Sequence, residues 1–515
     1  MMDIKKFKKS KIKLLILFLI IFIVLLPLIY ISISFIGRIS PDSVIPDSFT
    51  AYINVPSPIS MADNLFSHEP FSDIFLTQAF SPYFPMVEKI KENILEKKWV
   101  RFVAKRPLNG AIFPEGKFLV AWDIGIASSV IRFFPNIVGE PFTQAGKKYR
   151  FQYRAPDNSI IFIQPYKNLL IISNDITLFE SVFDKTSRSA VAGGSNKKTF
   201  LSRNFDAGFL IASESFISWL VRPSPTTDAF LEHIKFAELV ELALMFSPKK
   251  IDISVASSVA SDTASIEKLI LRDSKITALV EHLPGNTQYS TVFSIGTVEE
   301  LLEASFAVYR QRMPMNLRRI DATARMFLGV SLNDLLFSWT AAEVAVLGLE
   351  ARSAPVFVLQ ISDEEKRKDI FEKTFKSSVV ENIFGLPDGV HIPQIELPSF
   401  LDMLLNIWGI NISTPFYTVQ NGFLFVSESP ENIFSITNSI EKNDLLPKTE
   451  LWNSLSNPGS EKSSLTLFYS LERIIPIFVK TSDAFRDALR LYTHGLLTLD
   501  IDDTIATVNL SAVPE

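Results

Sequence analysis

The stretch from Pro46 to Val55 reads PDSFTAYINV, and the stretch from Pro284 to Phe293 reads PGNTQYSTVF. Each begins with a proline and continues into a run that mixes apolar and polar side chains. In the first stretch, every second position from Phe49 onward is apolar. A period of two residues is typical of a β-strand with one buried face. We therefore interpret both stretches as the first strand of two related domains.

Two more blocks recur in the same order. NLLIIS at Asn168–Ser173 corresponds to GFLFVS at Gly422–Ser427, and FLI at Phe209–Ile211 corresponds to LFY at Leu467–Tyr469. The members of the three pairs are separated by 238, 254 and 258 residues. A drift this small favours an internal duplication. We predict a first domain over 44–275 and a second over 276–515, with the extra residues of the second copy between its first and second blocks.

Local signals indicate the types of the elements. Val356–Leu359 reads VFVL, a short apolar run suited to a central strand. Ser362 with Glu365 fits a capping box, in which side chains satisfy the first amides of a helix. Ser429 followed by Pro430 fits an N-cap with proline at the first helical position. Strands and helices alternate without regular βαβ spacing, so the sequence predicts an α+β fold with mainly antiparallel sheets packed by helices.

The chain begins with a basic segment and then an apolar one. The run Leu14–Ile36 contains no charged residue and follows six lysines, which are Lys5, Lys6, Lys8, Lys9, Lys11 and Lys13. A bilayer core of roughly 30 Å needs about 20 apolar helical residues, and lysines before a span keep that end in the cytoplasm. We predict a cytoplasmic basic segment over 1–13, a transmembrane helix over 14–36, a linker over 37–43 and a periplasmic or extracellular remainder.

A cleaved signal peptide is the alternative interpretation of this segment. Its apolar region spans about 7–15 residues and ends at a small-residue cleavage site. The run Leu14–Ile36 is longer and shows no such site. We therefore favour a single retained anchor in the cytoplasmic membrane.

Composition limits the classes of function. The 515 residues are 47% hydrophobic and 21% charged, enough for two or more cored domains. The net charge of −5 argues against nucleic acid, which needs a clustered basic face. The chain has no cysteine, which removes disulfides, thiolate metal sites and thiol nucleophiles. It has 43 phenylalanines, which either fill the core or line an apolar groove for a lipid or a partner.

One region resembles a known family. The run Phe327–Trp339 reads FLGVSLNDLLFSW and leads into Glu343–Val346, which reads EVAV. With the strand at Val356 and the acidic helix start at Asp363, this resembles the uncharacterised bacterial family called domain of unknown function 3352. The resemblance covers about 283–480 and extends more faintly over 44–222, and Ala341 and Ala342 stand where a glycine is expected before the glutamate. It implies one N-terminal membrane helix and a large extracytoplasmic region, and it implies no catalytic residues.

The sequence shows no local catalytic or metal motif. The chain lacks HExxH, GxSxG and GxxxxGK patterns. Ser195 with Lys198 matches SxxK, but in a loop of small residues without a companion KTG, and a catalytic serine needs a helix to aim the lysine at it. The five histidines are expected at scattered surface or loop positions, and they are His68, His233, His282, His391 and His494.

Two sets of carboxylates have simple structural interpretations. Asp500, Asp502 and Asp503 lack EF-hand spacing, and a turn between two terminal strands explains the last two better. Glu214 and Glu472 follow the third pair of blocks. They could act as an acid–base pair, but a repeated charge at a helix N-terminus is simpler. We therefore predict no catalytic, cofactor-binding or metal-binding residues, and no cofactor.

Three functions remain open. The first is a membrane-anchored, non-enzymatic envelope protein that binds or scaffolds a protein or lipid partner, which fits the anchor and the duplication. The second is a carrier of an apolar ligand such as a lipid, suggested by the phenylalanines and a mean hydropathy of +0.22. The third is a hydrolase whose residues come together only in the fold. The first is the function that we predict.

Overall fold

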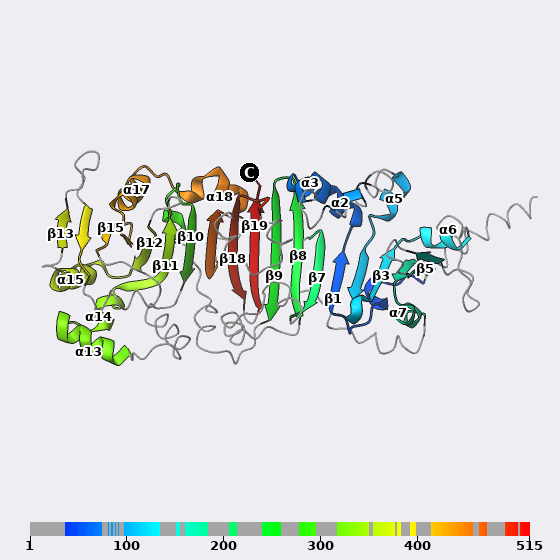
Figure 1. Ribbon diagram of the computed structural model, residues 1–515, viewed down its shortest axis with the longest axis horizontal. Coiled ribbons are helices and arrows are strands. Elements are labelled where there is room, and N and C mark those ends of the chain that lie inside the picture. Colours follow the sequence, from blue (N-terminus) through cyan, green and yellow to red (C-terminus); the bar gives the residue numbers. More distant parts are fainter. Residues whose placement is uncertain are drawn as a thin grey trace, which may run out of the picture. The chain divides into compact units, whose positions relative to one another are not determined.

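The structure is a computed structural model, shown in Figure 1. It describes residues 37–74, 97–133, 151–154, 160–183, 205–213, 239–258, 278–294, 317–349, 354–375, 379–382, 392–397, 414–456, 463–470, 490–502 and 505–514, and positions 81, 84, 85, 88 and 91. The chain forms two compact units. The predicted span over 14–36 lies outside the described residues. Among the residues that are described, no helix is long and apolar enough to cross a membrane.

Unit 1 takes the described parts of Met1–Ser67, Pro82–Ser215 and Glu241–Phe246. Its antiparallel sheet has the strand order β4-β5-β6-β3-β2-β1-β7. The strands are β1 (Ala51–Val55), β2 (Leu108–Ile112), β3 (Phe118–Asp123), β4 (Phe151–Arg154), β5 (Ile160–Tyr166), β6 (Leu169–Ser173) and β7 (Ala207–Ala212), and most of β8 (Leu239–Ser247) also belongs to this unit. The helices are η1 (Pro41–Val44), α2 (Pro58–Ser67), α5 (Lys98–Val103), η4 (Pro114–Gly116), α6 (Ala127–Phe133) and α7 (Ile176–Ser181).

Unit 2 takes the described parts of His68–Ser81, Phe216–Val240 and Ser247–Glu515. Its antiparallel sheet has the order β13-β14-β15-β16-β12-β11-β10-β17-β18-β19-β9. The strands are β9 (Lys250–Ser258), β10 (Tyr289–Ser294), β11 (Thr340–Gly348), β12 (Val356–Ile361), β13 (Val379–Asn382), β14 (Ile392–Ile395), β15 (Phe416–Gln420), β16 (Phe423–Ser427), β17 (Leu465–Ser470), β18 (His494–Asp502) and β19 (Ile505–Val513). The helices are α3 (Pro70–Ile74), η6 (Val280–His282), α13 (Leu317–Leu328), α14 (Leu332–Leu336), α15 (Glu364–Phe375), α17 (Pro430–Glu441), η8 (Leu446–Lys448) and α18 (Glu450–Leu455).

The predicted α+β class with antiparallel strand pairing is therefore confirmed. Several predicted elements also form. The first blocks contain β1 and β10, the second blocks contain β6 and β16, and the third blocks lie in β7 and β17. The run at Val356 forms β12. Asp502 is the last residue of β18 and pairs with Ile505, the first residue of β19, whereas Asp503 lies outside the described residues.

The first strands of the two units pair in matching registers. Ala51 of β1 faces Ile211 of β7, and Tyr289 of β10 faces Tyr469 of β17. The two positions in unit 2 lie 238 and 258 residues after their counterparts in unit 1. These are the separations of the first and third sequence blocks. The sheet pairing therefore follows the same register as the block alignment.

The corner between strand and helix also matches. Ser173 Oγ donates to the Phe118 carbonyl at 2.6 Å, and the backbone N–H of Asp175 donates to Ser173 Oγ at 3.1 Å. In unit 2, Ser427 Oγ donates to the Pro355 carbonyl at 3.1 Å. The N–H of Ser429 likewise donates to Ser427 Oγ, at 3.2 Å. The serine hydroxyl at this position thus links the end of one strand to the neighbouring strand. It also accepts a backbone hydrogen bond at the start of the following helix.

The N-caps of the two following helices are equivalent. Asp175 accepts from the N–H groups of Thr177 and Leu178, both at 2.9 Å, and caps α7. Ser429 accepts from the N–H of Asn432 at 3.2 Å and caps α17, with proline in its first turn. The predicted Ser429–Pro430 helix start is confirmed. These side chains satisfy amides that the helix itself leaves without partners.

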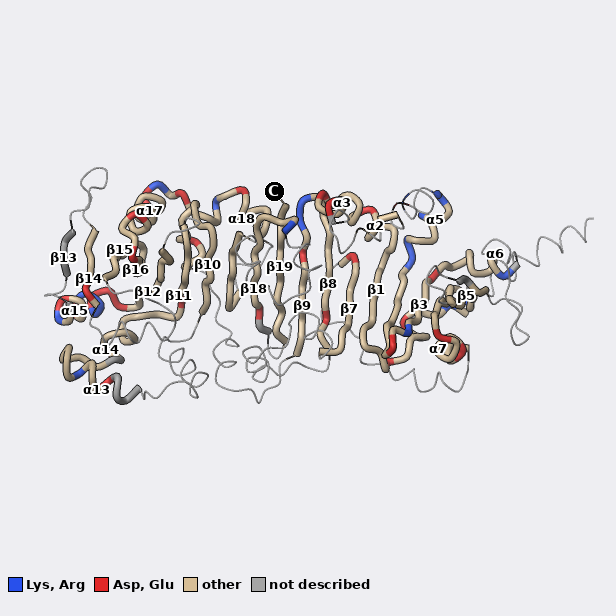
Figure 2. The backbone as a smooth tube through the Cα atoms, in the orientation of Figure 1, with Lys and Arg blue, Asp and Glu red and all other residues tan. Residues whose placement is uncertain are grey.

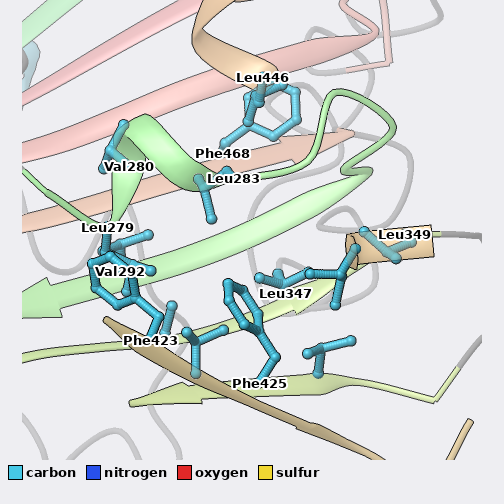
Figure 3. Close-up of a cluster of buried hydrophobic side chains, with 14 of the residues drawn as sticks. Leu279, Val280, Leu283, Val292, Leu347, Leu349, Phe423, Phe425, Leu446 and Phe468 are labelled. Atoms are coloured by element: carbon cyan, nitrogen blue, oxygen red, sulfur yellow. The ribbon is translucent and has the colours of Figure 1, made fainter. Parts of the chain in front are cut away.

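The cores consist of the inward faces of alternating strands. In β3 and β6 of unit 1, Leu119, Ala121, Leu169 and Ile171 are fully buried, together with Phe179 of α7. Unit 2 has a larger cluster, drawn in Figure 3, which includes Leu283, Val292, Leu347, Phe425 and Phe468. Helix α17 contacts β14, β15 and β16, so it covers part of that sheet. Burial of these apolar side chains is the main stabilising term in each unit.

Three details differ from the predictions. Asp363, rather than Ser362, supplies the acceptor at the start of α15: its Oδ1 accepts from the N–H of Lys366 at 3.0 Å, while Ser362 Oγ donates to the Thr340 carbonyl. Residues 250–258 form β9, which pairs with β19 in unit 2, although the predicted first domain extends to 275. Within the predicted linker over 37–43, Arg38 and Ile39 are bonded to unit 1, as described next.

Candidate membrane-contact site

Asp123 lies at the end of β3 and is 2% exposed. Its Oδ2 accepts a hydrogen bond from Arg38 Nη2 at 2.5 Å. Its Oδ1 accepts from the N–H of Gly125 at 2.9 Å, and Arg106 Nη1 lies 3.7 Å from the same oxygen. A buried carboxylate needs this kind of charge pairing and hydrogen bonding. Asp123 therefore joins the start of the described chain to the residues that follow α5.

The next residue is fixed in the same way. The N–H of Ile39 donates to Asn168 Oδ1 at 2.9 Å, and Asn168 Nδ2 donates back to the Ile39 carbonyl at 3.0 Å. Asn168 is 3% exposed, and Ile45, which follows η1, is fully buried. The two reciprocal bonds hold the backbone as a neighbouring strand would. The chain is thus bound to unit 1 from Arg38 onward, only two residues after the end of the predicted span.

Gly125 makes the approach of Arg106 possible. Its φ of +54° is a conformation that non-glycine residues rarely adopt. A Cβ at this position would lie 2.7 Å from the guanidinium carbon of Arg106. A side chain here would therefore both strain the backbone and displace the arginine from Asp123.

Helix α5 has one buried side and one apolar side that faces solvent. Val100 and Val103 are 6% and 7% exposed, whereas Trp99 and Phe102 are each 64% exposed. The spacing of three residues places the two aromatics on the same side of the helix. The N–H of Ile59 donates to the carbonyl of Ala104 at 2.9 Å, which holds the end of α5 against the start of α2. The aromatics are therefore presented outward by a helix that is itself packed.

Basic residues surround these aromatics. Lys97, Lys98, Arg101 and Lys105 are all exposed, and positions 97–105 contain no acidic residue. Figure 2 shows this basic stretch on α5 and the chain that follows it. Arg101 donates to Asp63 at 2.6 Å and 3.2 Å. We call the five residues Lys97, Lys98, Trp99, Phe102 and Lys105 the α5 surface.

No sequence motif singles out the α5 surface. The signal that could have found it is local: two aromatics three residues apart inside a run of cations, in a segment that reads KKWVRFVAK. The periodicity alone does not say which side of so short a helix is buried. The structure does, because the valines contact the core and the aromatics do not.

Only some of the candidates from the sequence lie within the described residues. Ser195, Glu214, Glu472, Asp503, His233 and His391 lie outside the described residues. Among the residues that are described, no group of three histidine, aspartate or glutamate side chains could hold a metal ion. His282 Nδ1 bonds to the Ala278 carbonyl, and its ring lies against Phe423. His494 stacks on Phe468, and burial lowers the pKa of its imidazole.

His68 lies in the bend that follows α2, which is a loop position as expected, but it does not lie at the surface. Its side chain is 2% exposed. Its Nδ1 lies 2.6 Å from the Ser247 carbonyl, and its Nε2 lies 2.8 Å from the Tyr492 hydroxyl. With Nδ1 protonated, the imidazole donates to the carbonyl and accepts from the tyrosine. Burial raises the pKa of that Tyr492 hydroxyl, which keeps it a donor at neutral pH. His68 is a buried structural link in unit 2.

Comparisons with known proteins assign no family. No family model matches the chain, and no curated protein matches it. Among solved structures, three crystal forms of the Treponema protein TP0453 match. Forms III, IV and I are 10%, 11% and 11% identical in sequence, with TM-scores of 0.23, 0.24 and 0.25. The matches cover 46%, 46% and 44% of this chain and 88%, 86% and 82% of TP0453. At these values they transfer neither residues nor activity to this chain.

Proposed function

We propose that the chain is a membrane-anchored, non-enzymatic envelope protein in which unit 1 sits directly at the membrane surface and the folded units bind or scaffold a partner. The observation that carries this proposal is the attachment of Arg38 and Ile39 to unit 1. The apolar run that is read as the anchor ends at Ile36. An extended chain spans at most about 3.6 Å per residue. Unit 1 is therefore held within about 7 Å of the end of that run.

This short connection supports a role at the membrane surface. A protein that reaches partners far from its membrane needs a long, solvated tether. Here Arg38, Ile39 and Ile45 are bonded to unit 1 or buried in it, so little of the predicted linker is left to act as a tether. The anchor would fix the orientation of unit 1 as well as its location.

We also infer that the two units are copies of one ancestral domain. The matching registers of β1–β7 and β10–β17 support this. So do the equivalent serine bonds at Ser173 and Ser427. Two copies of one domain suit a protein that presents two binding faces. A catalytic role receives no comparable support, since His68, His282 and His494 each bond to a different set of partners.

The phenylalanines favour this proposal over an apolar carrier. Phe49, Phe113, Phe179, Phe425 and Phe468 are each at most 9% exposed. Phe179 packs against Phe162 and Phe183, and Phe468 packs against Trp452. In the described parts of the chain, these rings therefore pack inside the cores, as core filling requires.

The anchor is tested by alkaline extraction of membranes that contain the full chain. A spanning chain stays in the pellet at high pH, whereas peripheral proteins are released. Replacing Ile21 and Leu25 with arginine should release the chain, because charges at the bilayer centre are costly. Replacing the same residues with valine is the matched control. Release of the unaltered chain would overturn the anchor.

The binding role is tested by cross-linking in intact cells, followed by purification of the full chain from detergent. The proposal expects a cross-linked adduct that depends on the folded units. The binding role would be overturned if the chain were recovered only at its own mass. This result counts only at cross-linker levels that capture other envelope complexes.

A further inference from the structure

We propose that the α5 surface docks into the headgroup region of an anionic membrane, so that unit 1 contacts the bilayer at a second point beside its anchor. This inference rests on the proposed anchoring. It adds a lipid-binding surface, a named set of residues and a class of lipid. The ligand is the anionic bilayer itself, recognised by aromatic insertion and by phosphate attraction.

The chemistry of the α5 surface suits the boundary between water and hydrocarbon. Trp99 and Phe102 are each 64% exposed. Exposing an aromatic side chain to water costs free energy, and burial in an apolar environment removes that cost. Tryptophan is enriched at this boundary because its ring is apolar and its N–H is polar. Lysine side chains lie along the same boundary with their ammonium groups toward the phosphates. The arrangement is that of a helix that lies in the interface.

The α5 stretch carries an excess of positive charge. Four cations and no carboxylate occur over 97–105, whereas the whole chain carries a net charge of −5. Among the described residues, Arg101 of this stretch pairs with Asp63, and Lys97, Lys98 and Lys105 contribute a positive field. Lysines on a helix at a membrane surface are attracted to anionic lipids. A surface with this sign is complementary to an anionic membrane.

The position of the α5 surface is set by the bonds that hold the start of the chain. Arg106 follows α5 by three residues and approaches Asp123, the carboxylate that accepts from Arg38. Arg38 is two residues from the predicted end of the anchor. The same buried carboxylate therefore ties the α5 segment to the point at which the chain leaves the membrane.

Unit 2 offers a natural comparison. Met326 and Phe327 of α13 are 72% and 69% exposed, so this helix also presents apolar side chains. Its neighbouring Arg325 is paired with Asp321 at 2.8 Å. Exposed apolar area alone thus occurs in both units, and substitutions in α13 control for a general loss of apolar surface.

Fluorescence quenching in proteoliposomes tests the proposal directly. The full chain is reconstituted into vesicles of three parts phosphatidylcholine to one part phosphatidylglycerol, with or without bromine on the acyl chains near the headgroup. The predicted anchor contains no tryptophan, so it contributes no signal. We expect the brominated lipid to quench Trp99, and Trp99→Phe to remove most of the quenched emission. Trp452→Phe, which alters a buried residue of unit 2, should leave the quenched part unchanged.

The lipid class is tested by charge. Lys97→Gln, Lys98→Gln and Lys105→Gln combined should reduce the quenching of Trp99 severalfold, as should vesicles of phosphatidylcholine alone and raised salt. Lys442→Gln and Phe327→Ser are controls with no expected effect. Circular dichroism checks that each variant folds. We expect these variants to fold, because the substituted residues are exposed. Equal quenching of Trp99 in neutral and anionic vesicles would overturn the anionic part of the proposal.

Two further outcomes are decisive. If Trp99→Phe leaves the lipid-dependent quenching unchanged while alkaline extraction still shows an anchored chain, the docking is overturned and the proposed function stands. If Trp99 is shielded from an aqueous quencher only at high protein-to-lipid ratios, a second copy covers the α5 surface, and the docking is again overturned.

Discussion

Arg38 Nη2 donates a hydrogen bond to Asp123 Oδ2 at 2.5 Å, across 85 residues of sequence. The arginine side chain is 49% exposed and the aspartate side chain 3% exposed. The bond thus links a half-exposed residue beside the predicted span to the buried end of a central strand. Through this contact, a membrane anchor would hold unit 1 in a fixed position.

The two partners should differ in their effect on stability. Asp123→Ala removes the acceptor of Arg38 and of the Gly125 N–H, so it should lower the free energy of unfolding of unit 1 by about 3 kcal/mol. Arg38→Ala removes a half-exposed partner and should cost no more than about 1 kcal/mol. Hydrogen exchange of β3 peptides, read by mass spectrometry on the full chain, measures both. Equal costs would mean that the pair, and not the buried carboxylate, stabilises the unit.

The buried link in unit 2 should be sensitive to one hydroxyl. Tyr492→Phe leaves His68 Nε2 buried without its 2.8 Å partner, which should cost about 1–3 kcal/mol. In combination with His68→Leu the loss should be smaller than the sum of the two single effects, because both remove one interaction. Urea unfolding of the four variants gives the coupling. Strict additivity would show that the two rings do not stabilise each other.

The two equivalent N-caps should respond differently to pH. Hydrogen bonds from Thr177 and Leu178 lower the pKa of the Asp175 carboxyl. A group whose pKa falls on folding stabilises the folded state above its unfolded pKa of about 3.9 and loses this as the pH falls through the folded value. The Ser429 cap carries no such charge. Asp175→Ala and Ser429→Ala should each cost about 1 kcal/mol at pH 7.

At pH 3 the cost of Asp175→Ala should shrink while that of Ser429→Ala persists. Asp175→Ser is the matched control, since it keeps a cap but removes the titration. Local exchange rates of α7 and α17, corrected for the intrinsic pH dependence, provide the measurement. A cost of Asp175→Ala that stays constant to pH 3 would refute the ionised cap.

The hairpins before these helices suggest a stabilising substitution. Lys167 and Asn421 occupy equivalent turn positions, and both have a φ of 51°. Asparagine tolerates this conformation better than lysine does. Lys167→Asn should therefore stabilise unit 1 by a few tenths of a kcal/mol, and Asn421→Lys should destabilise unit 2 by a similar amount. Changes in the urea midpoint with the same sign in both variants would contradict this.

Much of the strand framework follows from sequence, because alternating burial leaves a period that can be read directly. The blocks at Pro46, Asn168 and Phe209 lead into or lie within strands, and Ser429 caps a helix. The Asp363 cap was missed because Ser362 and Asp363 are both good acceptors. Only the backbone geometry decides which of two neighbours reaches the helix.

The candidate site was harder to predict from the sequence. Arg38, Arg106 and Asp123 are far apart in sequence, and nothing local marks their convergence. His68 was expected at a surface or loop position, and its burial was missed because a lone histidine has no pattern that reports burial. The orientation of Trp99 and Phe102 follows from which side of α5 packs, and that depends on contacts with the rest of unit 1.

Single-cysteine labelling tests whether the chain is anchored by its N-terminus with both units outside the cytoplasm. The sequence contains no cysteine, so the unaltered chain gives no background labelling. Ser10→Cys lies in the basic segment, and Asn453→Cys lies at an exposed position of α18. A membrane-impermeant maleimide is added to spheroplasts and to inverted vesicles of a bacterial host. We expect spheroplasts to label Asn453→Cys and to protect Ser10→Cys, and inverted vesicles to reverse the pattern. Labelling of Ser10→Cys or protection of Asn453→Cys in spheroplasts would contradict this topology.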